Sequence, residues 1–385
     1  MNLKNRTCVV AFLILTMAHT VWNGSSWADD NLSEALAAVC KVEANGVGNE
    51  SAVKAMQVLN NASVDDIPAI LIAMDDANSI SENLLRGVIS KIASRGDSLP
   101  KAEIKSYYKD FNHSPMGRLL AFDLLTSGNP ELAEKWIPGL VDDPSLPLRY
   151  RAIDALMKEA ESLKESDPAT AIGKLGLALG KARDVAQIQK LAGELGKLGV
   201  KINLQKQMGF IHQWNVVGCF DNKDQSGFDV QYGPESNVNE IDLSATYTDL
   251  SGNEASWQSV TTAHPTGIVD INERIGKIKG ATVYAVGNFK AESDSEAEIR
   301  IGTPNATKIW VNGKLVMSNE IYHNSDSIDK FVGKFNLVKG DNQILIKVCQ
   351  NEQTQPWAQD WQFQLRICDS TGKPIPEAKP APQRY

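Results

Sequence analysis

The stretch KIWVNGKLVM, residues 308–317, places the dipeptide Asn312-Gly313 between two short runs of alternating side chains. A two-residue turn of type I′ needs positive φ at both central positions, and Asn-Gly meets that need at little steric cost. The stretch therefore predicts a β-hairpin with strands over residues 308–311 and 314–317.

Similar alternating runs recur on both sides of this hairpin, and turn residues separate them. Many short strands of this kind are typical of a β-sandwich or a jelly roll. We therefore expect an all-β jelly-roll sandwich over residues 207–370. Its other strands are expected at residues 214–217, 241–247, 282–289, 298–301, 331–337, 343–348 and 362–367.

Four stretches of this half share a further pattern, and they are residues 214–222, 227–235, 301–314 and 342–348. Together they resemble the galactose-binding-like β-sandwich modules of bacterial exported proteins. The resemblance implies a binding or accessory role, often for carbohydrate, and it treats the Trp-x-Asn-Gly-Lys hairpin as a structural hallmark. One departure is Cys219, which stands where such modules usually have the proline of Gly-Pro-Phe.

The chain before residue 203 has a different pattern, in which apolar residues recur at helical spacing. Turn and cap residues interrupt this pattern often enough to predict about ten helices. Almost no β-branched alternation occurs there. The whole chain is therefore expected to be α+β and multidomain, with an all-α half before the β half.

The helical half contains an internal repeat that is aligned on Arg86, Arg118 and Arg149, which lie 32 and 31 residues apart. One helical hairpin per repeat of this length is typical of an α-solenoid. Residues 143–152 also resemble the start of the second helix in HEAT-like repeats. We expect a HEAT-like helical-hairpin solenoid over residues 29–203, with an irregular helical bundle as the alternative.

The two ends of the chain have the composition of segments outside the folded domains. Lys4 and Arg6 precede an apolar run, and Ser26-Trp27-Ala28 has the small residues of a cleavage site, so residues 1–28 are expected to be a signal peptide. The alternative is an uncleaved anchor. A cleaved signal implies export to the bacterial periplasm or beyond, with no stable membrane span afterwards. Residues 371–385 contain four prolines and are expected to form a disordered tail.

Length and composition exclude several classes of protein. The 385 residues carry 39 Lys and Arg against 47 Asp and Glu, a formal net charge of −8. Binding to nucleic-acid phosphates needs a basic surface, so we expect no nucleic-acid partner. A hydrophobic content of 42% and a mean hydropathy of −0.25 exclude a disordered chain and a multi-span membrane protein.

The best ligand candidate is Trp357, which lies in a polar loop between two predicted strands. An indole ring can stack on the apolar face of a sugar, while Gln355, Gln359 and Asp360 could bind its hydroxyl groups. The alternative is a ring that folds back over the edge of the sandwich. Trp361 shares the parity of the apolar residues in its strand and is expected to face the core.

A disulfide between Cys349 and Cys368 is expected, because both cysteines fall on the more polar faces of two strands that could be adjacent. It would hold the base of the Trp357 loop. The four cysteines outside the predicted signal peptide can be paired in three ways, so the other two pairings remain open. Cys40 is expected to be a buried free thiol.

One segment has the alternating oxygen ligands of a calcium loop. It contains Asn222, Asp224, Ser226 and Asp229, but the twelfth position is Gly233 instead of glutamate. A polar turn is the alternative. We expect no other metal and no required cofactor, with calcium as the one candidate.

We find no catalytic motif in the sequence, and His113, His212, His264 and His323 are scattered along it. The predicted function is therefore that of a non-catalytic exported binding protein, in which the β-sandwich on a helical platform recognises carbohydrate or a partner protein. The alternative is an envelope scaffolding protein that binds other proteins through the solenoid. That alternative predicts a buried Trp357.

Overall fold

The computed structural model describes residues 26–378, and it divides the chain into two compact units, residues 1–130 and 131–385. Most of the predicted signal peptide, residues 1–25, lies outside the described residues, and residues 26–28 lie in the first helix. Within the described part of the chain, no helix has the length and apolar character needed to cross a membrane.

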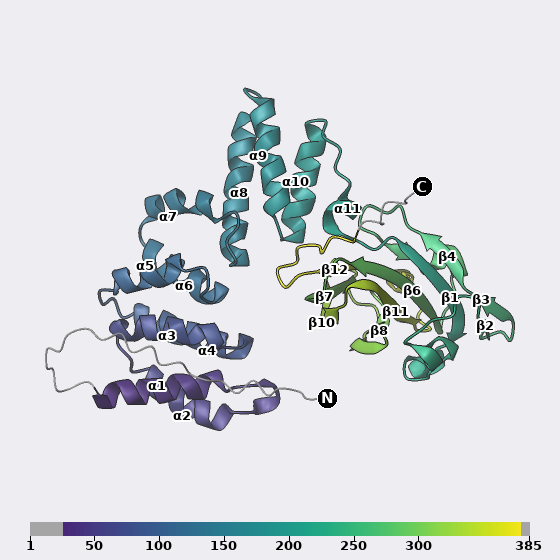
Figure 1. Cartoon of the computed structure of the whole chain (residues 1–385), viewed down its shortest axis with the longest axis horizontal. Helices are drawn as coiled ribbons and strands as arrows, with labels where there is room; N and C mark the ends of the chain where they lie inside the picture. The colour runs from purple at the N-terminus through teal and green to yellow at the C-terminus, as the bar shows by residue number, and fades with distance from the viewer. Residues whose placement is uncertain (1–25, 379–385) are drawn as a thin grey trace. The chain divides into compact units, whose positions relative to one another are not determined.

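The first unit consists of helices that pack as antiparallel hairpins, and successive hairpins lie on one another (Figure 1). The expected helical hairpins are therefore present in this unit. Buried apolar residues such as Leu59, Ile70 and Leu85 fill the space between them. The helices are α1 (Ser26–Cys40), α2 (Asn49–Leu59), α3 (Ile67–Ala73), α4 (Ser79–Ala93), α5 (Lys101–Lys109) and α6 (Pro115–Thr126).

Two of the three arginines that align the repeat have a common structural role. Arg118 and Arg149 lie in the first turns of α6 and α8 (Leu146–Leu163), and both are buried. Their guanidinium groups donate to backbone carbonyls of the turn before each helix, with Arg118 binding Asp110 O at 3.1 Å and Arg149 binding Asp143 O at 2.9 Å. Arg86 is exposed, so the first repeat does not share this contact.

The second unit begins with α7 (Pro130–Trp136) and α8, followed by α9 (Pro168–Lys181) and α10 (Val185–Lys197). Apolar side chains from α8, α9 and α10 form one buried cluster. Met208 from α11 (Leu204–Met208) and Phe210 also belong to this cluster. The last helices are therefore packed against the entry to the β-sheets.

The β half is a sandwich of two antiparallel sheets, with a six-stranded sheet in the order β4-β1-β6-β11-β8-β9 and a four-stranded sheet in the order β10-β7-β12-β5. Eight of the predicted runs are strands, whereas of residues 241–247 only the end enters a strand. The strands are β1 (Gln213–Asp221), β2 (Thr246–Thr248), β3 (Glu254–Ser256), β4 (Gln258–Thr261), β5 (Val269–Asp270), β6 (Ala281–Ala291), β7 (Ser295–Gly302), β8 (Ala306–Val311), β9 (Lys314–Asn319), β10 (Phe331–Leu337), β11 (Gly340–Gln350) and β12 (Gln362–Cys368). A short helix, α12 (Ile271–Ile275), follows β5.

The predicted hairpin is formed by β8 and β9, in which Val311 pairs with Lys314. Its turn has the positive φ angles that the sequence requires, 48° at Asn312 and 76° at Gly313. The Asn312 side chain also accepts a hydrogen bond from Gln343 N at 2.9 Å, which ties the turn to β11.

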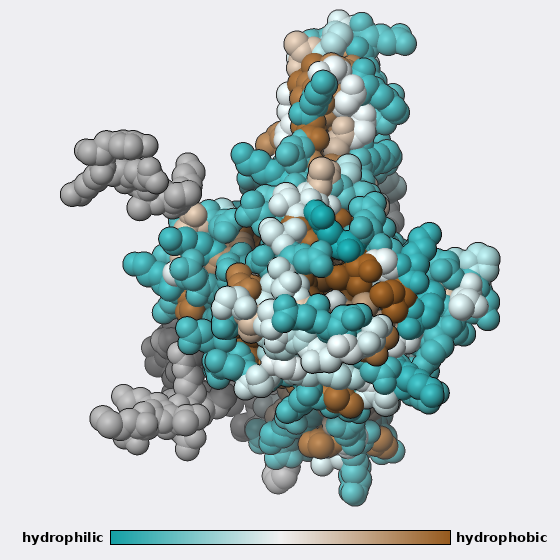
Figure 2. Space-filling model, turned by 90° about the vertical axis from the view of Figure 1, so that its right-hand side faces the viewer, coloured by the Kyte–Doolittle hydropathy of each residue, from teal (hydrophilic) through white to brown (hydrophobic). Residues whose placement is uncertain are grey.

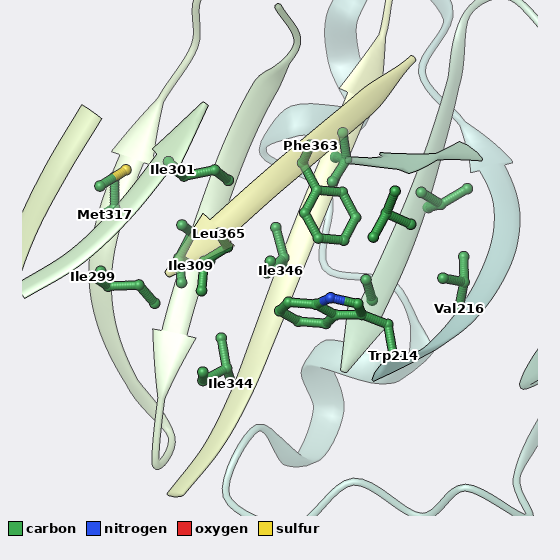
Figure 3. Close-up of a cluster of buried hydrophobic side chains, with 14 of the residues drawn as sticks. Trp214, Val216, Ile299, Ile301, Ile309, Met317, Ile344, Ile346, Phe363 and Leu365 are labelled. Carbon is green, nitrogen blue, oxygen red and sulfur yellow. The ribbon is translucent and has the colours of Figure 1, made fainter. Parts of the chain in front are cut away.

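The main core lies between the inner faces of the two sheets (Figure 3). It is made of alternate strand residues, as the period of two predicts. Trp214 meets the ring of Phe363 edge-on with the centroids 5.0 Å apart, and Trp361 is fully buried, as predicted.

A buried arginine connects the helical part of the second unit to the sandwich. Arg366 on β12 is fully buried, and its Nε donates to Asp329 Oδ1 at 2.7 Å. Its Nη1 also donates to Met208 O at 3.2 Å and to Gly372 O at 3.4 Å. One side chain thus holds three segments that are far apart in the sequence.

The prediction of a disordered tail is wrong for its first part. Residues 371–378 are hydrogen-bonded to the sandwich. Ile375 N donates to Ile367 O at 3.0 Å, and Ala378 N donates to Lys290 O at 2.7 Å. Ile375 also packs against the main core, because it is an apolar residue among the prolines. The rest of the tail lies outside the described residues.

Candidate functional site

The loop between β11 and β12 holds Trp357 out from the sandwich. The residue is 62% exposed, whereas Trp361, four positions later, is fully buried. Exposing an indole forgoes on the order of 2 kcal/mol of hydrophobic stabilisation. Trp357 therefore does not cover the core, and most of its surface is available to a ligand.

Hydrogen bonds at the base of the loop fix its backbone. Ala358 O accepts from Lys279 Nζ at 2.6 Å and from Gln350 Nε2 at 3.2 Å. Burial lowers the pKa of the Lys279 ammonium, while the charge of Asp360 opposes this effect. Since Trp357 precedes Ala358 in the short 3₁₀ turn Pro356–Ala358, these bonds also place the indole.

A histidine from a second loop supports the indole. The rings of His323 and Trp357 meet at an angle of 87° with their centroids 5.1 Å apart. His323 has a φ of 54°, a left-handed conformation that few residues other than glycine adopt. Its Nε2 lies 2.6 Å from Asn351 Oδ1, and this hydrogen bond holds the ring in place.

A third segment joins these two loops. Asn222, at the end of β1, is fully buried, and its Nδ2 donates to Gln350 O at 3.0 Å and to the hydroxyl of Tyr322 at 3.3 Å. Asp224 N donates to Glu352 Oε1 at 2.5 Å. The segment with the candidate calcium ligands therefore lies beside the Trp357 loop, at one end of the sandwich.

The four predicted ligand-binding residues share the Trp357 loop but do not all offer free side chains. Gln355 and Asp360 are exposed. The amide of Gln359 is already used, because its Nε2 donates to Thr354 O at 2.7 Å and to Gln355 O at 3.0 Å. Gln359 stabilises the loop and leaves Trp357, Gln355 and Asp360 as candidates for contact with a ligand.

The residues of the predicted calcium loop are engaged separately. Ser226 Oγ donates to Lys223 O at 2.6 Å, and Asp229 forms an ion pair with Lys308 at 2.8 Å. The Asn222 amide donates to Gln350 as described above. Among the residues that the structure describes, no three or more His, Cys, Asp or Glu side chains form a group that could hold a metal ion. The segment has the geometry of the alternative, a polar turn.

The predicted disulfide is wrong. Cys349 and Cys368 do lie on the outer faces of β11 and β12, but these strands belong to different sheets, and both cysteines are free thiols. Cys349 accepts a hydrogen bond from Thr282 Oγ1 at 3.2 Å. Burial raises the pKa of each of these two thiols to about 11. Cys40 is also free, and it is half-buried.

The outer face of the six-stranded sheet is closed by an insertion, residues 222–257, between β1 and β4. Its anchor is Lys347 on β11, which is fully buried and donates to Glu235 Oε1 at 2.8 Å and to Val230 O at 2.7 Å. The hydroxyl of Tyr284 donates to the same carboxylate oxygen. This face of the sheet is therefore not a ligand platform.

The surface in the view of Figure 2 is mostly hydrophilic, with hydrophobic residues grouped near its centre and along the upper part of the view. Scattered exposed apolar side chains are normal on soluble surfaces and do not by themselves mark a site. Among residues 30–378, Trp357 is the one tryptophan with an exposed side chain.

Sequence reasoning missed His323, Tyr322 and Asn351 as parts of the site. In the sequence, His323 is one of several scattered histidines, and nothing near it forms a motif. Its neighbours at the site come from residues 28 or more positions away, so only the folded chain reveals them.

Comparisons with known proteins give only weak structural likenesses. No protein-family model matches the chain, and no curated protein matches it. The solved structures that it resembles include an anti-sigma factor domain-containing protein from Clostridium clariflavum, at 15% identity and a TM-score of 0.24, covering 45% of this chain and 49% of that one. The chain thus spans about half the length of that protein.

Two further likenesses come from proteins of other kinds. A family 35 carbohydrate binding module from Clostridium thermocellum is 17% identical with a TM-score of 0.18, covering 27% of this chain and 88% of that one. A beta-glucosidase from Kluyveromyces marxianus is 12% identical with a TM-score of 0.25, covering 40% of this chain and 16% of that one. TM-scores this low carry no argument about fold or ligand.

Proposed function

We propose that this chain is a non-catalytic exported binding protein that recognises carbohydrate through Trp357, at the end of a galactose-binding-like β-sandwich. The helices would form a HEAT-like platform for this module, and residues 1–28 would be a signal peptide of a bacterial exported protein. The observation that carries the proposal is the exposed indole on a hydrogen-bonded loop.

Several further features support recognition of a sugar at this place. A ring held by fixed backbone bonds loses little conformational entropy on binding. Glu352, Gln355 and Asp360 of the same loop have exposed polar side chains. The alternative of a scaffolding protein predicted a buried Trp357, which the 62% exposure contradicts.

The test is a glycan array probed with the full chain, once with calcium and once with a chelator. We expect saturable binding that Trp357→Ala abolishes, with no dependence on calcium. Leu315→Ala is the matched control, because Leu315 is a 54% exposed apolar residue in the β8–β9 hairpin. Absence of binding by the folded protein, or equal binding by Trp357→Ala, would contradict the proposal.

A further inference from the structure

The hydrogen bonds around Asn351 determine which nitrogen of His323 carries a proton. Asn351 Nδ2 donates to Gln353 Oε1 at 3.2 Å, and Gln353 N donates to Asn351 Oδ1 at 3.1 Å. These two bonds orient the Asn351 amide, so the atom facing His323 Nε2 at 2.6 Å is an oxygen that can only accept. His323 Nε2 must therefore be the donor.

The other ring nitrogen then has a free lone pair. A neutral imidazole carries one proton, and if Nε2 holds it, Nδ1 is a hydrogen-bond acceptor. Within residues 30–378, His323 Nδ1 has no hydrogen-bond partner. The ring that bears it lies edge-to-face with Trp357, so an acceptor with a fixed position stands beside the exposed indole.

Two carboxylates add further acceptors in this part of the site, while the Lys279 ammonium is already bound to Ala358 O at the base of the loop. Glu352 Oε1 receives the hydrogen bond from Asp224 N, and the carboxylates of Glu352 and Asp224 are both exposed. Burial raises the pKa of Tyr322, the residue that precedes His323, and the charges of Glu320 and Glu352 raise it further. Such a set accepts hydrogen bonds from hydroxyl groups and repels carboxylates and sulfates.

We infer that His323 Nδ1 accepts a hydrogen bond from a hydroxyl group of an uncharged sugar that stacks on Trp357. This inference rests on the proposed function and narrows it to neutral glycans. It also makes His323 a specificity residue, because an analogue without that hydroxyl would leave the nitrogen unpaired.

Two substitutions separate ligand contact from support of the loop. His323→Gln keeps a donor at the position of Nε2 for Asn351 but has no atom in place of Nδ1. His323→Asn keeps an acceptor near the position of Nδ1, tolerates the φ of 54° and loses the bond to Asn351. Thermal melts of both full-length variants would confirm that they are folded.

The measurement is isothermal titration calorimetry with neutral galacto-, gluco-, manno- and xylo-oligosaccharides and with an oligogalacturonide as the anionic probe. We expect His323→Gln to weaken binding of the neutral probe about tenfold or more, and His323→Asn to weaken it less. We expect no measurable binding of the oligogalacturonide at the Trp357 site.

Three outcomes would overturn the inference and leave the proposed function intact. These are unchanged affinity in His323→Gln, a larger loss in His323→Asn than in His323→Gln, and Trp357-dependent binding of the oligogalacturonide in preference to the neutral probes. If wild-type protein binds no probe, or Trp357→Ala binds as well as wild type, the proposed function fails first, and the inference falls with it.

Discussion

At the scale of single residues, Trp357 and Trp361 show how position in a strand or loop decides the role of a side chain. The parity of β12 predicted a core position for Trp361, and it is fully buried. The loop before β12 left Trp357 open to two interpretations, since a loop residue can fold back or point outward. Sequence alone could not decide between these two interpretations of Trp357, because the contacts that hold its loop come from Lys279 and His323.

These two tryptophans should differ in their contribution to stability. We expect Trp361→Ala to lower the free energy of unfolding by about 3–5 kcal/mol, because it leaves a cavity in the core. Trp357→Ala should change it by less than about 1 kcal/mol, since the ring is mostly in water. Denaturant unfolding of both variants measures this, and equal losses would mean that Trp357 has a structural role.

The buried ion pair between Lys347 and Glu235 gives a second prediction. We expect Lys347→Ala to cost about 3–5 kcal/mol of stability, because it leaves a carboxylate buried without its partner. Adding Glu235→Gln should recover part of that loss. Lys308→Ala is the control, since its partner Asp229 is exposed and such pairs contribute about 1 kcal/mol or less.

At the scale of elements, local signals were the reliable ones. The Asn312-Gly313 turn and the alternating strands follow from backbone sterics and side-chain period, and both are present. The closure of the outer face by residues 222–257 could not be predicted, because this segment contains little regular structure and is held by Lys347, 112 positions after its partner Glu235. The prediction of a Cys349–Cys368 disulfide was wrong for a similar reason. The alternation of side chains shows which face of a strand a cysteine lies on, but it does not show which sheet the strand joins.

The turn itself can be tested with Gly313→Ala. Gly313 has a φ of 76°, and a Cβ there would lie 1.9 Å from Asn239 Oδ1, so the substitution combines strain with a clash. We expect it to lower stability by about 1–3 kcal/mol. Gly252→Ala isolates the strain, because Gly252 has a φ of 82° with nothing within 4 Å of the added carbon. If both variants lose equally, the contact with Asn239 is not significant.

At the scale of the whole molecule, the two-part α+β organisation could be read from the change in pattern near residue 203. The division of the chain into two compact units could not be predicted from this pattern, because the helices after residue 130 belong to the same unit as the β-sheets. That association depends on Arg366 and Asp329, which lie in a strand and a loop without any motif. It depends also on residues 371–378, whose proline content suggested disorder.

The same contact makes the stability of the second unit depend on pH. Burial alone would raise the pKa of the Asp329 carboxyl, but its hydrogen bonds and charge interactions with Arg366 and Arg300 lower it overall. A lowered pKa means that this carboxylate stabilises the folded state above its unfolded value, about 4, and that the contribution is lost as the pH falls further.

We therefore expect the free energy of unfolding to fall below about pH 4 in wild type. Asp329→Asn should be less stable at pH 7 and should show a smaller fall in acid. Asp294→Asn, at an exposed carboxyl in the turn between β6 and β7, is the control. Chemical unfolding at several pH values measures this, and an unchanged acid response in Asp329→Asn would refute it.

The contact between Arg366 and Met208 spans 158 positions, and it has a consequence for the order of folding. Bringing two residues so far apart in the chain into contact costs conformational entropy before the contact adds any stability. Proteins with a high contact order therefore fold slowly. A nascent chain can form α8–α10 from local contacts. Met208 O, however, cannot accept its hydrogen bond from the Arg366 guanidinium until β12 and the residues after it have been synthesised. The helices at this end of the unit therefore form early, but their packing is completed only when the last segment of the chain is present.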